Sequence, residues 1–233
     1  MNQGTSALTL EFFHDVVCGW CFNLSPRLRA LADEFKLDVR HRTFVLQDSR
    51  ERMAEVFGSP ATAKETILGH WSACAASSET PERFAIERMR AAPFDYPHGL
   101  PAALACHAAQ RLEGQAGHWR LFDALQVAHL SEARNVADVD VLLDIARAAG
   151  FPADAFRQAM LDPVTRERVE TDRRLARRLE LRSVPTVIVH ETGVRLRNGP
   201  LDELRAQLRQ QVGRPGASAG TGPTSAGIAE LLS

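Results

Sequence analysis

The sequence is poor in cysteine, has no excess of either charge and lacks any long hydrophobic run. Its 233 residues include only four cysteines, too few for a secreted scaffold of this length held together by disulfides. Lys and Arg number 28 against 29 Asp and Glu, a net charge of -1, so we expect neither nucleic acid nor a membrane surface as a partner. No apolar run approaches the roughly 18 residues of a membrane span.

We also expect no targeting segment at the start of the sequence. The first ten residues carry no basic leader and no apolar stretch of signal-peptide length. We therefore expect a cytoplasmic protein, in which a reduced resting state of the thiols is favoured.

The first fifty residues have the pattern of a β-α-β unit. Residues 8–13 are apolar and aromatic, which is typical of a buried strand. Apolar residues then recur at helical spacing from near Cys21, and residues 37–45 begin with the alternation of a second strand.

The rest of the chain is helical in its middle and returns to strands near its end. Residues 51–161 contain helices with recognisable caps and no convincing strand, and a further helix is expected over 162–179. Residues 184–189 and 193–197 indicate a hairpin, and 200–211 a last helix. The sequence thus predicts an α/β fold with the order β-α-β, an all-α insertion, then α-β-β-α.

The segment Cys18-Gly19-Trp20-Cys21 lies between the first strand and the first helix, where disulfide exchange is favoured. Two cysteines in the first turn of a helix are close enough to form a small disulfide ring. The positive end of the helix dipole stabilises a thiolate at Cys18. Cys21 is placed to attack a mixed disulfide on Cys18 and release the substrate.

The same spacing of cysteines is half of a zinc site. A zinc site needs two more ligands, and the remaining candidates are Cys74, with His70 one turn before it, and Cys106 with His107. None of these forms a second pair with metal-binding spacing. We therefore expect no metal site, and we expect Cys74 and Cys106 to be buried as small apolar residues.

A proline begins the predicted strand at 184–189. Pro185 has no N–H for a ladder of hydrogen bonds, which suits the start of an edge strand. A cis Val184–Pro185 bond would instead turn the Val184 backbone outward to pair with an extended substrate. The residues alone leave both readings open.

These motifs together resemble the DsbA-like branch of the thioredoxin superfamily, and in particular its FrnE-type members. The resemblance rests on residues 11–21, on residues 183–186 and on the helical insertion between them. It implies a thioredoxin fold with a mixed central sheet, built from residues 8–47 and 162–211, and a helical insertion domain over 48–161. Residues 213–233, rich in Gly, Ala, Ser and Pro, are expected to form a flexible tail.

The resemblance also implies roles for residues of the motif. Cys18 would be the nucleophile, Cys21 the resolving cysteine and Pro185 a cis proline facing both of them. Gly19 and Trp20 would tune the redox potential. FrnE-type proteins usually have proline where this chain has Gly19, which is a departure from their pattern.

Proton transfer at the site is less clearly indicated. Many thioredoxin-fold enzymes have a buried acid at the position of Phe12, so Glu11 and Asp15 are the nearby candidates, with Asp15 better suited to capping a turn. His14 would stabilise the Cys18 thiolate if the loop brought its imidazolium close.

The function expected is that of a thiol–disulfide oxidoreductase or isomerase, acting on cysteine-containing proteins or small thiols. Its only redox group would be the Cys18–Cys21 disulfide, with glutathione an open choice of co-substrate. Two alternatives stay open: a glutathione-dependent isomerase or transferase of the kappa type, such as 2-hydroxychromene-2-carboxylate isomerase, and a non-catalytic, chaperone-like binding module. The direction of electron flow and the oligomeric state, a homodimer included, are also left open.

Overall fold

The centre of the molecule is a mixed four-stranded sheet. The structure, a computed structural model, describes residues 8–212. The strands lie in the order β2-β1-β3-β4, with β1 parallel to β2 and antiparallel to β3, which is in turn antiparallel to β4. Their bounds are β1 (Thr9–His14), β2 (Asp38–Thr43), β3 (Thr186–Val189) and β4 (Arg195–Leu196). The predicted β-α-β unit and hairpin are confirmed.

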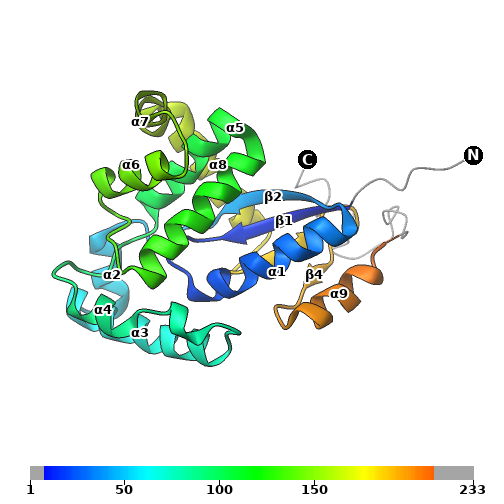
Figure 1. Cartoon of the computed structure of the whole chain (residues 1–233), viewed down its shortest axis with the longest axis horizontal. Coiled ribbons are helices and arrows are strands. Elements are labelled where there is room, and N and C mark those ends of the chain that lie inside the picture. Colours follow the sequence, from blue (N-terminus) through cyan, green and yellow to red (C-terminus); the bar gives the residue numbers. More distant parts are fainter. Residues whose placement is uncertain (1–7, 213–233) are drawn as a thin grey trace, which may run out of the picture.

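Helix α1 (Gly19–Phe35) connects the two parallel strands and packs against the sheet. It begins directly after Cys18, slightly before the start predicted near Cys21, because Cys18 has extended backbone angles and is the N-cap residue. Its apolar stripe is buried, and α9 (Leu201–Arg209) lies beside it. Figure 1 shows α1 running along the strands, with α9 below its end.

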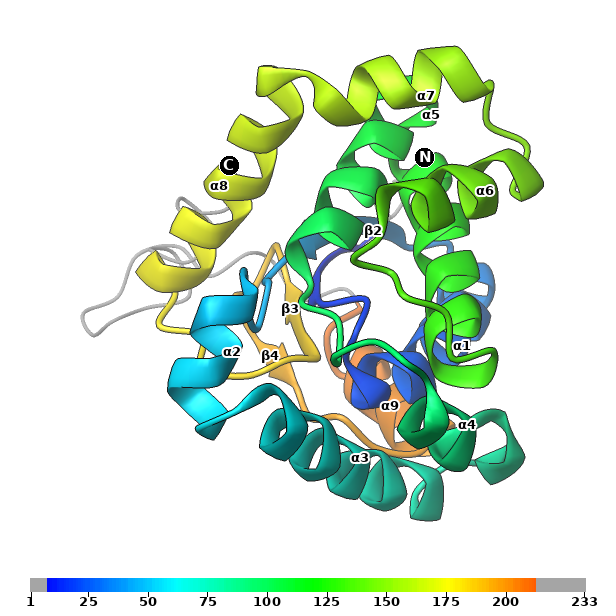
Figure 2. The ribbon, with the colours of Figure 1, turned by 90° about the vertical axis from the view of Figure 1, so that its left-hand side faces the viewer.

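A block of helices separates β2 from β3. Helix α5 is its longest member and is broken at Gly114, whose φ of +65° is in the region that favours glycine. Figure 2 shows α5 to α7 grouped together, with α8 and α1 on opposite sides of the strands. The helices are α2 (Arg50–Phe57), α3 (Pro60–Ala76), α4 (Ile86–Ala91), α5 (Leu100–Gln126), α6 (Val139–Ala148), α7 (Ala153–Leu161) and α8 (Pro163–Arg178), with a 3₁₀ turn at Pro81–Arg83 and a π-helical turn at Val127–Ser131.

The sheet and the helical block share one hydrophobic core. Leu10 and Phe12 of β1 belong to the same cluster of buried side chains as Trp71 of α3 and Phe156 of α7. Packing of the hydrophobic core is thus continuous across the predicted boundaries at 47/48 and 161/162. The predicted tail, 213–233, lies outside the described residues. None of the helices in the described part of the chain has the length and hydrophobicity needed to cross a membrane.

A buried polar network also joins the sheet to the block. Asp172 of α8 accepts hydrogen bonds from the backbone N–H of Thr43 (2.9 Å) and from Arg42, and it lies 3.0 Å from His107 Nε2 of α5. These partners hold the pKa of the Asp172 carboxyl below its usual range despite burial. The network fixes α5 and α8 against the outer strand, β2.

Candidate active site

The cysteine pair lies where β1 passes into α1. Cys18 caps α1, and its backbone N–H donates to the carbonyl of Asp15 (3.2 Å). The first turn of α1 has no acidic residue, so the positive end of the helix acts on the Cys18 sulfur without a competing carboxylate from that turn. All four cysteines are free thiols.

The second cysteine of the pair is sealed from solvent. Burial raises the pKa of the Cys21 thiol well above its usual value, and hydrogen bonding to Cys18 raises it further. Cys21 is 0% exposed and Cys18 is 6% exposed. The pair therefore consists of one sulfur that reaches a cavity and one neutral thiol behind it, the asymmetry that a nucleophilic and a resolving cysteine require.

The loop before β3 forms the opposite side of the site. The Val184–Pro185 peptide bond is cis. The carbonyl oxygen of Val184 lies 3.5 Å from Cys18 Sγ. Residues more than 160 positions apart in the chain thus meet at the reactive sulfur, because β3 pairs with β1 in the middle of the sheet.

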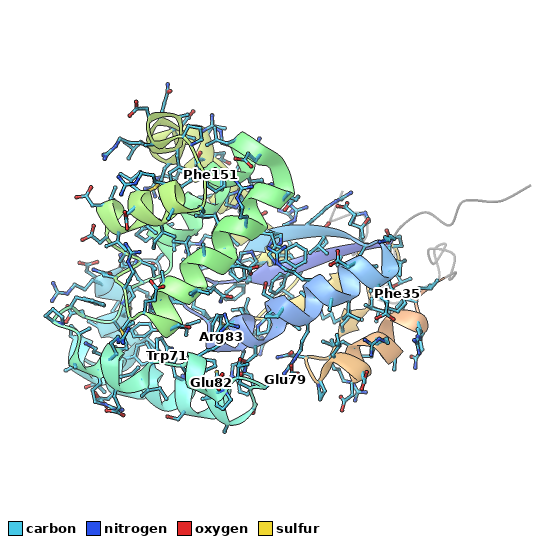
Figure 3. All side chains as sticks on the ribbon, viewed as in Figure 1. Phe35, Trp71, Glu79, Glu82, Arg83 and Phe151 are labelled. Carbon is cyan, nitrogen blue, oxygen red and sulfur yellow. The ribbon has the colours of Figure 1, made fainter. Side chains whose placement is uncertain are left out.

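A mainly apolar pocket opens over Cys18. Its volume is about 260 Å³, and its walls come from the start of α1, from the loop after β2, from α2 and α3, and from Val184. Trp20 lines it and is 37% exposed. Trp71 of α3, labelled in Figure 3, lines it from the helical block.

The Tyr96 hydroxyl connects the insertion to the cysteine loop. It donates to the carbonyl of Val17 (3.1 Å), accepts from Trp71 Nε1 (3.0 Å) and lies 2.9 Å from His129 Nε2. Helix α5 contributes a second connection, since Gln126 Nε2 donates to the carbonyl of Cys18 (3.2 Å). The insertion therefore positions Cys18 and the residue that precedes it.

The structure gives a steric reason for Gly19. A Cβ at this position would lie 2.9 Å from Cys74 Sγ and 3.2 Å from Phe84 Cε1. Any side chain here, a proline ring included, would displace them. Cys74 packs over the motif at the place that a side chain at position 19 would occupy. This contact accounts for glycine where FrnE-type proteins usually have proline. Burial raises the pKa of Cys74 to about 12, so it stays a neutral thiol.

Asp15 holds the loop that precedes the cysteines. Its carboxylate accepts from the backbone N–H groups of Leu46 (2.6 Å) and Val17 (3.3 Å), so it caps a turn, as the sequence indicates. Burial raises the pKa of this carboxyl to about 6, against the effect of these hydrogen bonds. Its charge also raises the pKa of Cys21. Glu11, the other candidate acid, is buried against Arg42 and His190.

His14 lies in a buried group of histidines. Its Nε2 is 3.1 Å from His41 Nδ1 and 3.2 Å from His118 Nε2, and its ring packs on Phe122. Burial lowers the pKa of His14 to about 3, so the ring is neutral near pH 7. The geometry gives no support to the idea that a His14 imidazolium stabilises the Cys18 thiolate.

The family model described as the DSBA-like thioredoxin domain matches residues 9–209. The chain belongs to this family. The family includes thiol–disulfide oxidoreductases, and the match agrees with the mixed sheet and the helical insertion described above.

Several individual proteins are also similar. The cytosolic disulfide reductase DsbM from Pseudomonas aeruginosa is 27% identical, with 88% of this chain and 98% of that chain covered and a TM-score of 0.68; it has also been solved with GSH. A candidate protein disulfide isomerase from Nitrosomonas europaea is 21% identical, with 89% and 100% covered and a TM-score of 0.72, a likeness of fold.

One similar curated protein is described as an adapter and not as an oxidoreductase. The ClpXP adapter protein SpxH from Shouchella clausii (strain KSM-K16) is 27% identical over 181 residues, which is 78% of this chain. The match spans 57% of the length of that relative.

The sequence located part of the pocket and missed the residues that support it. Cys18, Gly19, Trp20 and Val184 line the same pocket. The roles of Gln126 and Tyr96 had no signal in the sequence, because a lone Gln in a helix or a lone Tyr in a connecting loop resembles any core or surface residue. Their contacts depend on how the insertion folds back over the motif.

Proposed function

We propose that the protein is a disulfide reductase that works by thiol–disulfide exchange, with Cys18 as nucleophile, Cys21 as resolving cysteine and glutathione as the source of electrons. The observation that carries this proposal is the Cys18 sulfur at the positive end of α1, at an apolar pocket and 3.5 Å from the Val184 carbonyl. The likeness to a cytosolic disulfide reductase solved with GSH supports the direction and the co-substrate. Such a reductase would work in a reducing compartment such as the cytoplasm.

The proposed cycle begins with attack by the Cys18 thiolate on one sulfur of a substrate disulfide. The substrate S–S bond breaks, its second sulfur leaves as a thiolate, and Cys18 is joined to the substrate in a mixed disulfide. Cys21 then loses its proton and attacks the Cys18 sulfur, and the departing substrate thiolate takes up a proton. Two glutathione thiols then reduce the Cys18–Cys21 disulfide and become glutathione disulfide.

The pocket favours small or extended substrates. A volume of about 260 Å³ suits a cysteine with its neighbouring side chain, or part of a glutathione molecule, and excludes a folded domain. Gln47 lines this pocket, and its Oε1 has no hydrogen-bond partner, so it is placed to accept an N–H from a bound peptide. Folded substrates would have to offer a disulfide on an exposed or mobile segment.

Trapping the mixed disulfide tests this proposal. The Cys21→Ser protein, treated with glutathione disulfide, should gain one glutathione per chain on intact-mass analysis, because nothing resolves the adduct at Cys18. The matched Cys18→Ser protein should gain none at the pair. An equal adduct on both variants, or activity that persists in the Cys18→Ser protein, would contradict the proposed roles.

A second candidate function is that of an adapter which binds another protein without redox turnover. It is favoured by the 27% identity to a ClpXP adapter, and it agrees with the non-catalytic reading of the sequence. Replacement of both Cys18 and Cys21 by serine distinguishes the two functions. Disulfide reduction should be lost, whereas binding of a partner protein by an adapter should be unchanged.

The isomerase alternative predicts a different result with the same double variant. Relatives of the kappa type typically have serine near the position of Cys18, and this chain has cysteine at both positions. Glutathione-dependent isomerisation that survived the replacement of both cysteines would favour that alternative over a reductase.

A further inference from the structure

Three buried histidines from three different elements meet beneath the sheet. His14 ends β1, His41 lies in β2 and His118 lies in α5, and each is at most 1% exposed. One ring nitrogen of each histidine lies within 4.8 Å of a ring nitrogen of the other two. Phe12, Trp119 and Phe122 surround the rings.

Hydrogen bonding among the three rings leaves the cluster poorly satisfied. His118 Nδ1 lies 2.8 Å from Gln110 Oε1, which places its proton on Nδ1 and leaves a lone pair on Nε2. His14 Nε2 therefore has to carry a proton and donate it either to His118 or to His41. One N–H then serves two acceptors, and the distal nitrogens of His14 and His41 have no partner.

The spacing of the nitrogens also fits a metal ion. Two nitrogens bound to zinc at 2.0–2.1 Å with a tetrahedral angle are about 3.3 Å apart. The observed separations from His14 Nε2 are 3.1 Å to His41 Nδ1 and 3.2 Å to His118 Nε2. With a cation between the rings, all three inner lone pairs have a partner, and the proton of His118 stays on the nitrogen that faces Gln110. The distal nitrogens of His14 and His41 have no partner in either arrangement.

The chemistry of the donors limits which ion would bind. Neutral imidazoles suit Zn²⁺, Co²⁺, Ni²⁺ and Cu²⁺, and hard ions such as Mg²⁺ and Ca²⁺ prefer oxygen ligands. The centroid of the His107 ring lies 5.4 Å from the centroid of the His118 ring. His107 is hydrogen-bonded to the Asp172 carboxylate, so a negative charge lies near the cluster. A water or hydroxide would complete a four-coordinate site.

We propose that His14, His41 and His118 bind one Zn²⁺-type transition-metal ion as a buried structural site. The ion would join both parallel strands to α5, the helix that also holds the carbonyl of Cys18 through Gln126. Because the ligands are sealed from solvent, the ion enters during folding, and its binding contributes to the free energy of folding. This site is separate from the thiol pair and does not depend on the proposed reductase activity.

Metal analysis of the full-length chain tests the proposal. The chain is produced without a histidine tag and with Cys18 and Cys21 replaced by serine, so that the thiol pair offers no competing site. After refolding with one equivalent of Zn²⁺ and desalting, we expect about one zinc per chain. His41→Gln and His118→Gln should each reduce the zinc content per chain at least tenfold. His129→Gln, which removes an equally buried histidine outside the cluster, should leave it unchanged.

The absorption spectrum of the Co²⁺-loaded chain tests the proposal even if the ligand variants fail to fold. The same cysteine-substituted chain refolded with Co²⁺ should show the visible absorption of a four-coordinate nitrogen-ligated ion, without the near-ultraviolet band of a cobalt–thiolate bond. A chain that folds fully with a chelator present, and that takes up less than a tenth of an equivalent of either ion, would overturn the proposal and leave a hydrogen-bonded histidine cluster.

Discussion

Two buried centres flank the end of β1 and differ mainly in their access to solvent. The thiol centre opens through Cys18 into a pocket of about 260 Å³, with the half-exposed Trp20 in its wall. The histidine centre, which begins at His14, is closed on all sides by aromatic side chains and α5. Residues close in sequence thus contribute to both centres. Cys18 belongs to the open centre, which is suited to turnover, and His14 belongs to the closed one, which is suited to stabilising the fold.

The largest effect is expected at the open centre. Cys18→Ser removes the only sulfur of the pair that reaches the pocket, so reduction of glutathione disulfide or insulin should fall by about 1000-fold or more. Cys106→Ser is the matched control, because Cys106 is fully buried in α5. Similar losses in both variants would indicate a general effect on folding instead of the loss of a nucleophile.

The next largest effect is expected at Asp15, which lies between the two centres. Burial raises its pKa from 3.8 to about 6, so the folded state favours the neutral acid. This contribution to stability is complete below about pH 4 and is lost as the pH rises through about 6, a change of about 3 kcal/mol. Buried histidines such as His129, with its pKa lowered to about 4, act in the opposite direction.

The Asp15→Asn variant isolates this contribution. Free energies of unfolding of both proteins are measured from pH 4 to pH 7, and the value for the variant is subtracted from that for the original chain at each pH. The difference should decrease with rising pH, whereas contributions from the histidines cancel. A difference that does not change with pH would refute the raised pKa.

At the closed centre, we expect a loss of stability with little loss of chemistry. In the metal-free protein, His118→Gln removes a fully buried ring that lies 3.2 Å from His14 and should lower the free energy of unfolding by about 2 kcal/mol. The rate of thiol exchange in the folded variant should change less than threefold. A large fall in that rate, with stability intact, would mean that the two centres are not distinct in function.

The smallest effect concerns the packing of Cys74 on the motif. Gly19→Ala should cost about 1 to 2 kcal/mol, because the new Cβ would lie 2.9 Å from Cys74 Sγ. In the Cys74→Ala background the same substitution should cost much less. Unfolding measurements on the four proteins of this double-mutant cycle give the interaction free energy between positions 19 and 74. A value near zero would show that contact with Cys74 is not the reason for glycine at position 19.

More of the open centre than of the closed one could be predicted from the sequence. The order of elements, the cysteine pair and the loop at Pro185 follow from local patterns, since strand alternation and helix caps are short-range signals. The histidine cluster combines β1, β2 and α5, and the spacing of His14, His41 and His118 matches no metal-binding motif. Only the fold brings them together, as it does Gly19 and Cys74.

The reduction potential of the Cys18–Cys21 pair tests the central claim most directly. The protein is equilibrated in glutathione redox buffers, and the fraction of oxidised pair is determined by alkylation and mass analysis. A reductase that draws on glutathione should have a potential of about -200 to -270 mV, in the range of glutaredoxins and thioredoxin. A value near -120 mV, as in the strong oxidant DsbA, would contradict the proposed direction of electron flow.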